Sequence, residues 1–313
     1  MATFVSVSDG ALFLAFEKGF FKSQNIDVQF KSIPNSTMAI TSLASGDVDV
    51  SGGSAGGGVA NAVRQGIQIR LVADKGSAGP GHGYLAFVSR PDVADKIKVA
   101  ADLRGRVVGV AGYFSGVASE VTVSHMLRDA GMKESEINFI NLNFSDIVAG
   151  MGTGKIDVGL LVEPLATQMV AKGTGVIWKR VDEVYPNQQY TAVFYGPGII
   201  KRPDVAERFM QAYIQGARFY NDALKTKQGK DWEELVTVLA KYTTVKDRAL
   251  YEKMTFPGIN PDGYLNLKGM QDDMKWFVES GRMKESIDIA RMVDHSYIEK
   301  ALAKLGANKA KSQ

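Results

Sequence analysis

Gly46-Asp47-Val48-Asp49-Val50 and Gly154-Lys155-Ile156-Asp157-Val158 are two copies of one pattern, Gly-x-[Val/Ile]-Asp-Val, about a third of the chain apart. In both copies the glycine follows apolar residues at helical spacing, and the last three residues have the pattern of a strand. Glycine just after the last apolar residue is a common helix stop signal. Each copy therefore predicts a helix that ends at glycine and passes directly into a strand.

The segments before the two copies predict the same order of elements. The first has a strand at residues 4–7, a turn at 8–10, a helix from 12 that stops at Gly19, a strand at 26–30 and a helix capped by Ser36. The second has a strand at 107–110, a turn at 112–116, a helix at 117–130, a strand at 137–140 and a helix capped by Ser145. Such βαβαβ units build parallel sheets with right-handed crossovers.

Two similar units in one chain predict an α/β protein with two lobes, although one large doubly wound sheet remains an alternative. Strands around Tyr84 and Tyr190 are the candidates for the two crossings between the lobes. Beyond Pro203 the apolar spacing is helical, which predicts extra C-terminal helices on the first lobe. We therefore expect a discontinuous lobe I of residues 1–88 plus 197–313, and a lobe II of residues 89–196.

Composition excludes several classes of function. The 313 residues suffice for about two domains. Their 37 basic and 34 acidic residues form no block of like charge, which argues against a nucleic-acid partner. The absence of cysteine excludes disulfides, thiolate metal sites and a cysteine nucleophile. Three scattered histidines without H-E-x-x-H spacing predict no metal site, and no cofactor is expected.

Ligands of open parallel sheets bind beyond the carboxyl ends of the strands. Those ends are predicted at residues 8–10, 51–58, 112–116 and 163–164, and most lead into a helix whose N-terminus favours an anion. The small residues at 54–58 allow a ligand to approach the backbone, or they serve only a tight turn. The three glycines among them lack the lysine of a phosphate loop, and no G-x-G-x-x-G marks a dinucleotide site.

No motif indicates catalysis. Gly112-Tyr113-Phe114-Ser115-Gly116 differs from a nucleophile elbow because the serine is one position late. Glu163 is either a helix-entrance residue or a site residue, and His82 is either exposed or a ligand contact. Aromatic residues within or beside the small-residue loops either form a wall for a planar ligand or pack in the core. The pattern indicates binding without visible chemistry.

Several stretches resemble the periplasmic solute-binding proteins of nitrate/sulfonate/taurine ABC transporters, a group that includes thiamine-precursor binders. The stretches are 15–22, with Glu17-Lys18-Gly19-Phe20-Phe21, 39–50, 102–110, with Leu103-Arg104-Gly105-Arg106-Val107-Val108, 115–131, and 154–164, which ends in Glu163-Pro164. They keep the family's order over roughly the first half of the chain. The resemblance implies a type II periplasmic-binding fold whose two lobes close around a ligand.

The resemblance also implies partners, location and a binding site. It predicts a monomer that serves an ABC permease and ATPase in the periplasm, and the lack of a leader in this chain suits a removed signal peptide. Because the central loops carry no Arg or Lys, we expect a small organic anion, an alkyl or aryl sulfonate or an aromatic carboxylate. The alternatives are an enzyme on the same fold, of the pyrimidine-precursor or menaquinone pathway, or a sensor domain. The implied ligand-binding residues are Ser8, Asp9, Leu12, Ser54, Ala55, His82, Tyr84, Tyr113, Phe114, Ser115, Gly116, Phe144, Glu163 and Tyr190.

Overall fold

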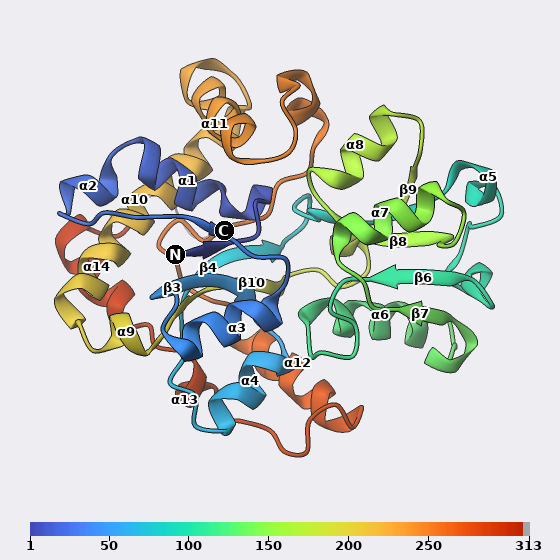
Figure 1. Cartoon of the computed structure of the whole chain (residues 1–313), viewed down its shortest axis with the longest axis horizontal. Coiled ribbons are helices and arrows are strands. Elements are labelled where there is room, and N and C mark those ends of the chain that lie inside the picture. The colour runs from blue at the N-terminus through green and yellow to red at the C-terminus, as the bar shows by residue number, and fades with distance from the viewer. Residues whose placement is uncertain (309–313) are drawn as a thin grey trace.

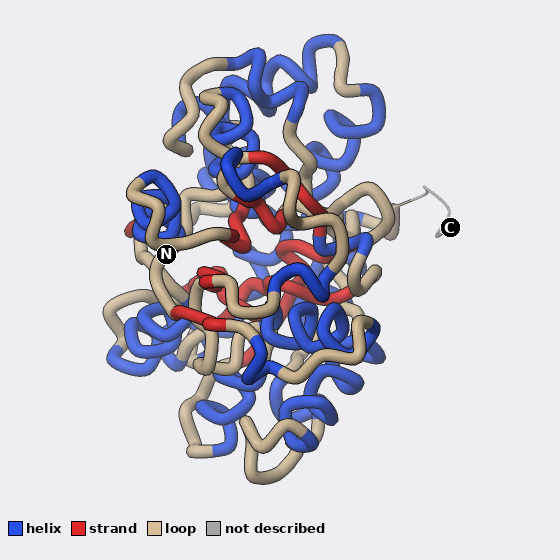
Figure 2. The backbone as a smooth tube through the Cα atoms, turned by 90° about the vertical axis from the view of Figure 1, so that its right-hand side faces the viewer, coloured by secondary structure: helices blue, strands red, loops and turns tan. Residues whose placement is uncertain are grey.

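The computed structural model describes residues 1–308 and has two lobes, each built around its own five-stranded sheet (Figure 1). The strands lie in the interior and the helices surround them (Figure 2). The first sheet contains β1 (Ala2–Thr3), β2 (Lys31–Ser32), β3 (Val50–Ser54), β4 (Arg70–Ala78) and β10 (Gln188–Tyr195). The second contains β5 (Leu85–Ser89), β6 (Val107–Val110), β7 (Asn138–Ile140), β8 (Val158–Val162) and β9 (Val176–Arg180). The predicted α/β class is confirmed, and a single doubly wound sheet is excluded.

The two sheets have the same topology, as the sequence repeat predicts. Their orders are β2-β1-β3-β10-β4 and β7-β6-β8-β5-β9. In each, the first three strands are parallel, and the fourth is antiparallel to both of its neighbours. That antiparallel strand comes from a different part of the chain, after the βαβαβ unit in the first lobe and before it in the second.

The two strands that were expected to cross between the lobes each belong to one sheet. β5 pairs with β8 and β9, and β10 pairs with β4 from Gln188 to Tyr195 and with β3 from Thr191 to Tyr195. The chain passes between the sheets at residues 79–84 and 181–187, which lie side by side where the Gly81 amide donates to Asp182 Oδ2 at 2.8 Å. The lobe boundaries expected at residues 88 and 196 therefore fall near the C-terminal ends of β5 and β10, not at the connections between the sheets. Residues 309–313 of the expected lobe I lie outside the described residues.

Two predicted strands are wrong because turn formation at one and side-chain packing at the other replace the sheet ladder. At residues 4–7 the Asp9 carboxylate accepts from the amides of Phe4 and Ser6, which folds the segment into a turn and the 3-10 helix η1 (Val7–Asp9). At residues 26–30 the apolar alternation serves packing instead, since the Phe30 ring contacts Phe13 edge-on at 5.2 Å. Pairing with β1 begins only at Lys31.

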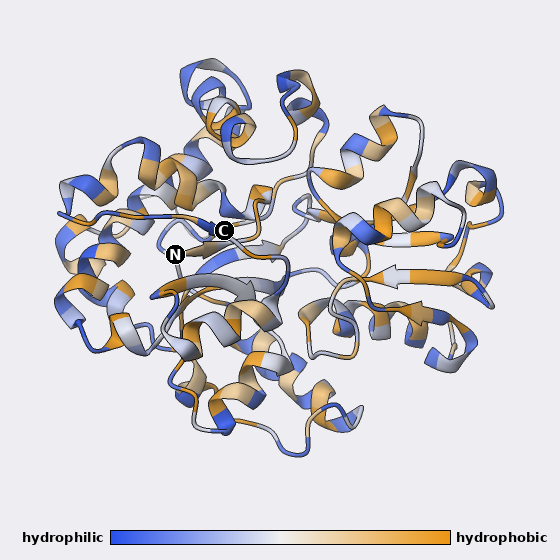
Figure 3. Cartoon of the chain, in the orientation of Figure 1, coloured by the Kyte–Doolittle hydropathy of each residue, from blue (hydrophilic) through white to orange (hydrophobic). Residues whose placement is uncertain are grey.

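The helices cover both sheets and show hydrophilic and hydrophobic bands (Figure 3). In the N-terminal half they are α1 (Gly10–Glu17), α2 (Phe20–Ser23), α3 (Ser36–Ser45), α4 (Gly57–Arg64), α5 (Pro91–Ala94), α6 (Ala118–Asp129) and α7 (Phe144–Gly152). The remainder are α8 (Leu165–Ala171), α9 (Pro197–Ile200), α10 (Pro203–Thr226), α11 (Gly229–Tyr242), α12 (Leu267–Glu279), α13 (Ile289–Met292) and α14 (Ser296–Leu305). No helix within residues 1–308 has the length and apolar character needed to cross a bilayer.

The expected C-terminal helices are present and pack mainly on the first lobe. α10 buries Phe209, Tyr213, Ala217 and Tyr220, a stripe at helical spacing, and packs on α1 and α14. α12 lies beneath the first sheet and also contacts α6 of the second lobe. The C-terminal region therefore joins the two lobes as well as covering the first.

The caps of α3 and α7 differ from the prediction by one or two residues. The N-cap positions belong to Asn35 and Asn143, not to Ser36 and Ser145. The Asn35 side chain accepts from the Met38 amide at 3.0 Å, as an N-cap residue does. Ser36 instead accepts from the Ser54 amide at 3.0 Å, which ties α3 to the end of β3.

The lobes touch through backbone at Gly56 and Gly116. The Gly58 amide donates to the Gly116 carbonyl at 2.9 Å, and a Cβ at position 56 would lie 2.3 Å from that carbonyl oxygen. Since the φ of Gly56 is −96°, alanine is locally tolerated there, and only the opposite lobe excludes a side chain. Gly56 is therefore required for the closed contact rather than for the turn.

We predict that Gly56→Ala opens the molecule, because the methyl group forces the lobes apart. The expected result is a larger radius of gyration by small-angle X-ray scattering and a melting temperature lower by several degrees. Gly152→Ala is the matched control, since a Cβ there meets nothing within 4 Å. Scattering from Gly56→Ala identical to that of the wild type would contradict the assignment.

Candidate functional site

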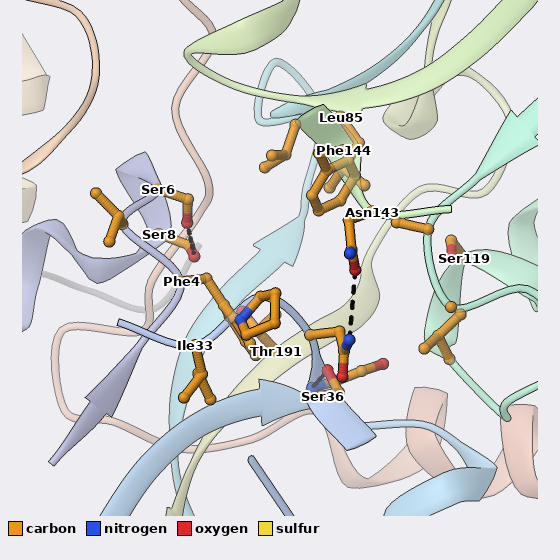
Figure 4. Close-up of a pocket in the computed structure, with 18 of the residues that line it drawn as sticks. Phe4, Ser6, Ser8, Ile33, Ser36, Leu85, Ser119, Asn143, Phe144 and Thr191 are labelled. Atoms are coloured by element: carbon orange, nitrogen blue, oxygen red, sulfur yellow. Dashed lines mark hydrogen bonds between the residues drawn. The ribbon is translucent and has the colours of Figure 1, made fainter. Parts of the chain in front are cut away.

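A cavity of about 620 Å³ lies between the lobes (Figure 4). It opens where the carboxyl ends of the parallel strands of both sheets meet, which is the predicted edge. The first lobe contributes Phe4, Val5, Ser6, Ser8, Ser32, Ile33, Pro34, Asn35, Ser36, Thr37, Met38, Ser54, Tyr190, Thr191 and Thr244. The remaining lining residues are Tyr84, Leu85, Ala111, Gly112, Ser115, Val117, Ser119, Asn141, Asn143, Phe144, Ser145, Val162, Pro164 and Leu165.

The lining combines hydroxyl and amide groups with an apolar wall. Serine, threonine, tyrosine and asparagine supply the polar atoms, while Phe4, Ile33, Leu85 and Phe144 supply apolar surface. Within residues 1–308, no Asp, Glu, Lys, Arg or His lines the cavity. Such a site holds a ligand by neutral hydrogen-bond donors and acceptors around an apolar body.

Six of the expected ligand-binding residues line the cavity, namely Ser8, Ser54, Tyr84, Ser115, Phe144 and Tyr190. The other eight, Asp9, Leu12, Ala55, His82, Tyr113, Phe114, Gly116 and Glu163, do not. Leu12 and Ala55 are fully buried, each in a different hydrophobic cluster. The structure brings together mainly those residues that end a strand or begin a helix on the cleft side.

The two acidic residues of the expected set have partners within the protein. Asp9 pairs with Lys75 and accepts from the amides of its own loop. Glu163 accepts from the amide and hydroxyl of Thr167 at 3.0 and 2.9 Å and pairs with Arg180 at 3.1 Å. Buried carboxylates need such donors, so Glu163 closes the first turn of α8 and does not face the cavity.

His82 and the aromatic pair of the 112–116 turn lie beside the cavity without lining it. His82 Nδ1 lies 3.0 Å from the Phe256 carbonyl oxygen. Tyr113 is buried and stacks on Phe139 with ring centroids 4.5 Å apart. Phe114 is 63% exposed, and its ring contacts Tyr113 edge-on with centroids 4.6 Å apart. Of the expected aromatic residues, Tyr84, Phe144 and Tyr190 line the cavity, and Phe4 lines it in addition.

The N-terminus of α6, near Ser115, is already occupied by a carboxylate of the protein. Glu120 Oε1 accepts from the amides of Gly116 and Val117 at 2.7 and 3.0 Å, and Ser54 Oγ accepts from the Ala118 amide at 2.8 Å. Burial raises the pKa of Glu120, although its ion pair with Arg282 opposes that shift. An anionic ligand on these amides would compete with Glu120.

The N-termini of α3 and α7 approach each other across the cavity, and of these two ends the sequence predicted only the α7 end, through Phe144. Asn35 Nδ2 donates to Asn143 Oδ1 at 3.3 Å, so the two cap residues meet between the lobes (Figure 4). The first-turn residues Ser36, Thr37, Phe144 and Ser145 line the cavity beside them. The detectable signal was an asparagine at the same place in both repeats, immediately before or close to the predicted caps.

Tyr190 belongs to a polar network that links β10 to the helices α6 and α12. Its hydroxyl contacts Thr122 of α6, which donates to Gln188, and Gln188 Nε2 donates to the Ala118 carbonyl and to Asp273 Oδ2, each at 2.8 Å. Burial raises the pKa of the Asp273 carboxyl to about 7, although the Gln188 hydrogen bond opposes the shift. In the described part of the chain, no cluster of three or more His, Cys, Asp or Glu side chains is arranged to hold a metal ion.

The sequence matches the NMT1/THI5-like family over residues 9–223, more than half of the chain. The chain belongs to this family. A relative of this NMT1/THI5-like chain, a putative binding protein of Brucella abortus, is 23% identical over 290 residues, which are 88% of this chain and 83% of that protein. The family predicted from the sequence is thus confirmed.

Solved structures of binding proteins share the fold of this NMT1/THI5-like chain. The periplasmic nitrate-binding protein NrtA of Synechocystis PCC 6803 has a TM-score of 0.78 at 14% identity, covering 97% of this chain and 88% of that one. The alkanesulfonate-binding protein SsuA of Xanthomonas axonopodis pv. citri, bound to MOPS, has a TM-score of 0.72 at 13% identity and covers 94% and 96%. The desulfurization enzyme DSZB is also similar, with a TM-score of 0.61 at 15% identity and coverage of 97% and 99%.

We predict that Asp273 makes stability fall as the pH rises. The pKa of the Asp273 carboxyl is raised to about 7 in the folded state, so the folded protein holds this proton more tightly than the unfolded chain does. The resulting stabilisation is complete below about pH 4 and is lost as the pH rises through about 7. Asp273→Asn removes this proton uptake. The slope of the unfolding free energy between pH 4.5 and 7 is then flatter by about 1 kcal/mol per pH unit, measured by urea denaturation. Parallel profiles for the variant and the wild type would refute the assignment.

Proposed function

We propose that this protein is the solute-binding component of an ABC importer and captures a small organic anion, an alkyl or aryl sulfonate or an aromatic carboxylate, between its lobes. The observation that carries the proposal is the interlobe cavity, with hydroxyl and amide donors around an apolar wall. The names of the Brucella relative and of the NrtA and SsuA structures agree with a binding role. We propose that lobe I comprises residues 1–78 plus 188–308 and lobe II residues 85–180, and the bounds of the strands in each sheet support this division.

The acidic group of the ligand is proposed to lie near the N-termini of α3 and α7. Both helix dipoles place partial positive charge at those ends, and the side chains of Asn35, Ser36 and Ser145 supply neutral donors there. A site without formal positive charge favours a single negative charge, because a dianion would lose its hydration without an ion pair in return. The apolar wall, with Phe144, receives the hydrocarbon part.

Capture is proposed to occur by lobe closure. Several of the contacts between the lobes are hydrogen bonds, such as Asn35 with Asn143 and Ser54 with the Ala118 amide. Contacts of this kind exchange readily with water, so a ligand that bridges both lobes shifts the population toward the closed form. The proposed partners are the membrane permease and ATPase, the proposed location is the periplasm, and the proposed state is a monomer.

The alternative is an enzyme, and the similarity to DSZB keeps it relevant. An enzyme of acyl, sulfur or proton transfer needs a nucleophile with a neighbouring base. The cavity offers serine hydroxyls, but within residues 1–308 no histidine or carboxylate lines it to activate them. This supports binding over turnover.

We expect the protein to bind benzenesulfonate, benzoate or butanesulfonate with a micromolar or lower Kd, and the neutral isosteres benzenesulfonamide and benzamide more weakly. Isothermal titration calorimetry measures the affinities, and mass spectrometry of the recovered ligand tests whether it is unchanged. A chemically altered ligand would favour the enzyme. Failure of every acid to bind would overturn the proposed ligand class.

Asn143→Ala is expected to weaken binding of the best acid about tenfold, because it removes an amide beside the α7 N-terminus and the contact with Asn35. Asn61→Ala, on α4 and outside the cavity lining, is the matched control. Titration calorimetry with both variants compares the losses. Equal affinities for the two variants would remove Asn143 from the site.

A further inference from the structure

A fully buried lysine lies directly behind one wall of the cavity. Lys75 of β4 has an exposed fraction of 0%, and its Nζ lies 2.8 Å from Asp9 Oδ1 and donates to Ser8 Oγ at 2.8 Å. Its hydrocarbon stem crosses Gly52 of β3, where a Cβ would lie 2.5 Å from Lys75 Cε. Glycine at position 52 therefore leaves the space that the lysine side chain occupies. The ammonium group contacts Ser8, whose hydroxyl separates it from the cavity.

The contacts of Lys75 determine what the serine pair offers to a ligand. An ammonium group only donates, so Ser8 Oγ accepts from it. Ser6 Oγ and Ser8 Oγ lie 2.7 Å apart and share one hydrogen bond, in either direction (Figure 4). Of the two hydroxyl hydrogens, that bond uses one. The other remains to be donated, and both serines line the cavity.

Asp9 positions this pair. Its Oδ2 accepts from the amides of Phe4 and Ser6 at 3.1 and 3.2 Å. These hydrogen bonds bend the loop so that Phe4 and Ser6 reach the cavity. Its Oδ1 faces Lys75 and makes the burial of the ammonium group tolerable. Asp9 itself does not line the cavity.

We propose that Lys75 is a specificity-determining residue, which acts through Ser8 and Ser6 to present a polarised hydroxyl donor to an anionic oxygen of the ligand. This inference rests on the proposed function and deepens it, because it names a group that distinguishes an acid from its neutral isostere. A hydrogen bond to a charged acceptor is about twice as strong as one between neutral groups. The nearby ammonium charge adds attraction only for the anion.

The competing explanation is that Lys75 and Asp9 are a purely structural ion pair. A structural role changes the affinity for acid and neutral ligands alike. The proposed role changes the ratio of the two affinities. The ratio is therefore the quantity to measure.

The test compares the wild type with the double variant Lys75→Met plus Asp9→Asn, using benzenesulfonate and benzenesulfonamide as probes in titration calorimetry. The double change avoids leaving either charge buried alone. We expect on the order of tenfold weaker binding of benzenesulfonate and unchanged binding of the sulfonamide. An unchanged ratio of affinities would overturn the role of Lys75.

Ser6→Ala keeps the ion pair and provides a second test if the double variant does not fold. It leaves Ser8 with its own hydrogen free to donate, so the preference for benzenesulfonate is expected to persist, whereas Ser6→Ala plus Ser8→Ala abolishes it. Retained preference in that double serine variant contradicts the proposal. If the wild type binds neither probe nor any of the other acids, the proposed function itself is overturned. If the wild type binds acids and every variant keeps the same preference for them, only the Lys75 inference is overturned.

Discussion

The antiparallel insertion of one strand into each sheet is the constraint on which the rest of the structure depends. β10 fills the gap between β3 and β4, and β5 fills the gap between β8 and β9. Each strand is reached from the other lobe, so the two connections run side by side between the sheets. Because of this, the carboxyl ends of both sets of parallel strands meet across one cleft, and the cavity forms there.

Desolvation decides which polar residues near that cleft remain available to a ligand. Each buried carboxylate there takes donors from the protein, as Glu120 does from the α6 amides and Glu163 from Thr167. An unpaired buried charge is too costly to leave in place. The groups left at the cavity surface are therefore neutral, and the buried cation Lys75 contacts the cavity lining through Ser8.

The repeat also explains why the site is shared between the lobes. Asn35 and Asn143 occupy equivalent positions, each as the N-cap of the helix that precedes the last strand of its βαβαβ unit, and they meet because the two units face each other. The helices behind them therefore point their N-termini at one space. Neither lobe alone presents such a surface, since residues of both lobes line the cavity.

The apolar spacing and the glycine stop signals of the sequence determined the α/β class, the two repeated units, most helices and the strand at 107–110. They could do so because both signals depend only on residues that are close in sequence. The family resemblance likewise depends on local motifs. Only the tertiary structure decided that residues 4–7 form a turn around Asp9 and that Tyr84 and Tyr190 reach the cavity while Tyr113 and Glu163 do not. These outcomes depend on partners distant in sequence, such as Lys75 for Asp9 and Arg180 for Glu163, and on the free energy of burying polar groups, which no local pattern records.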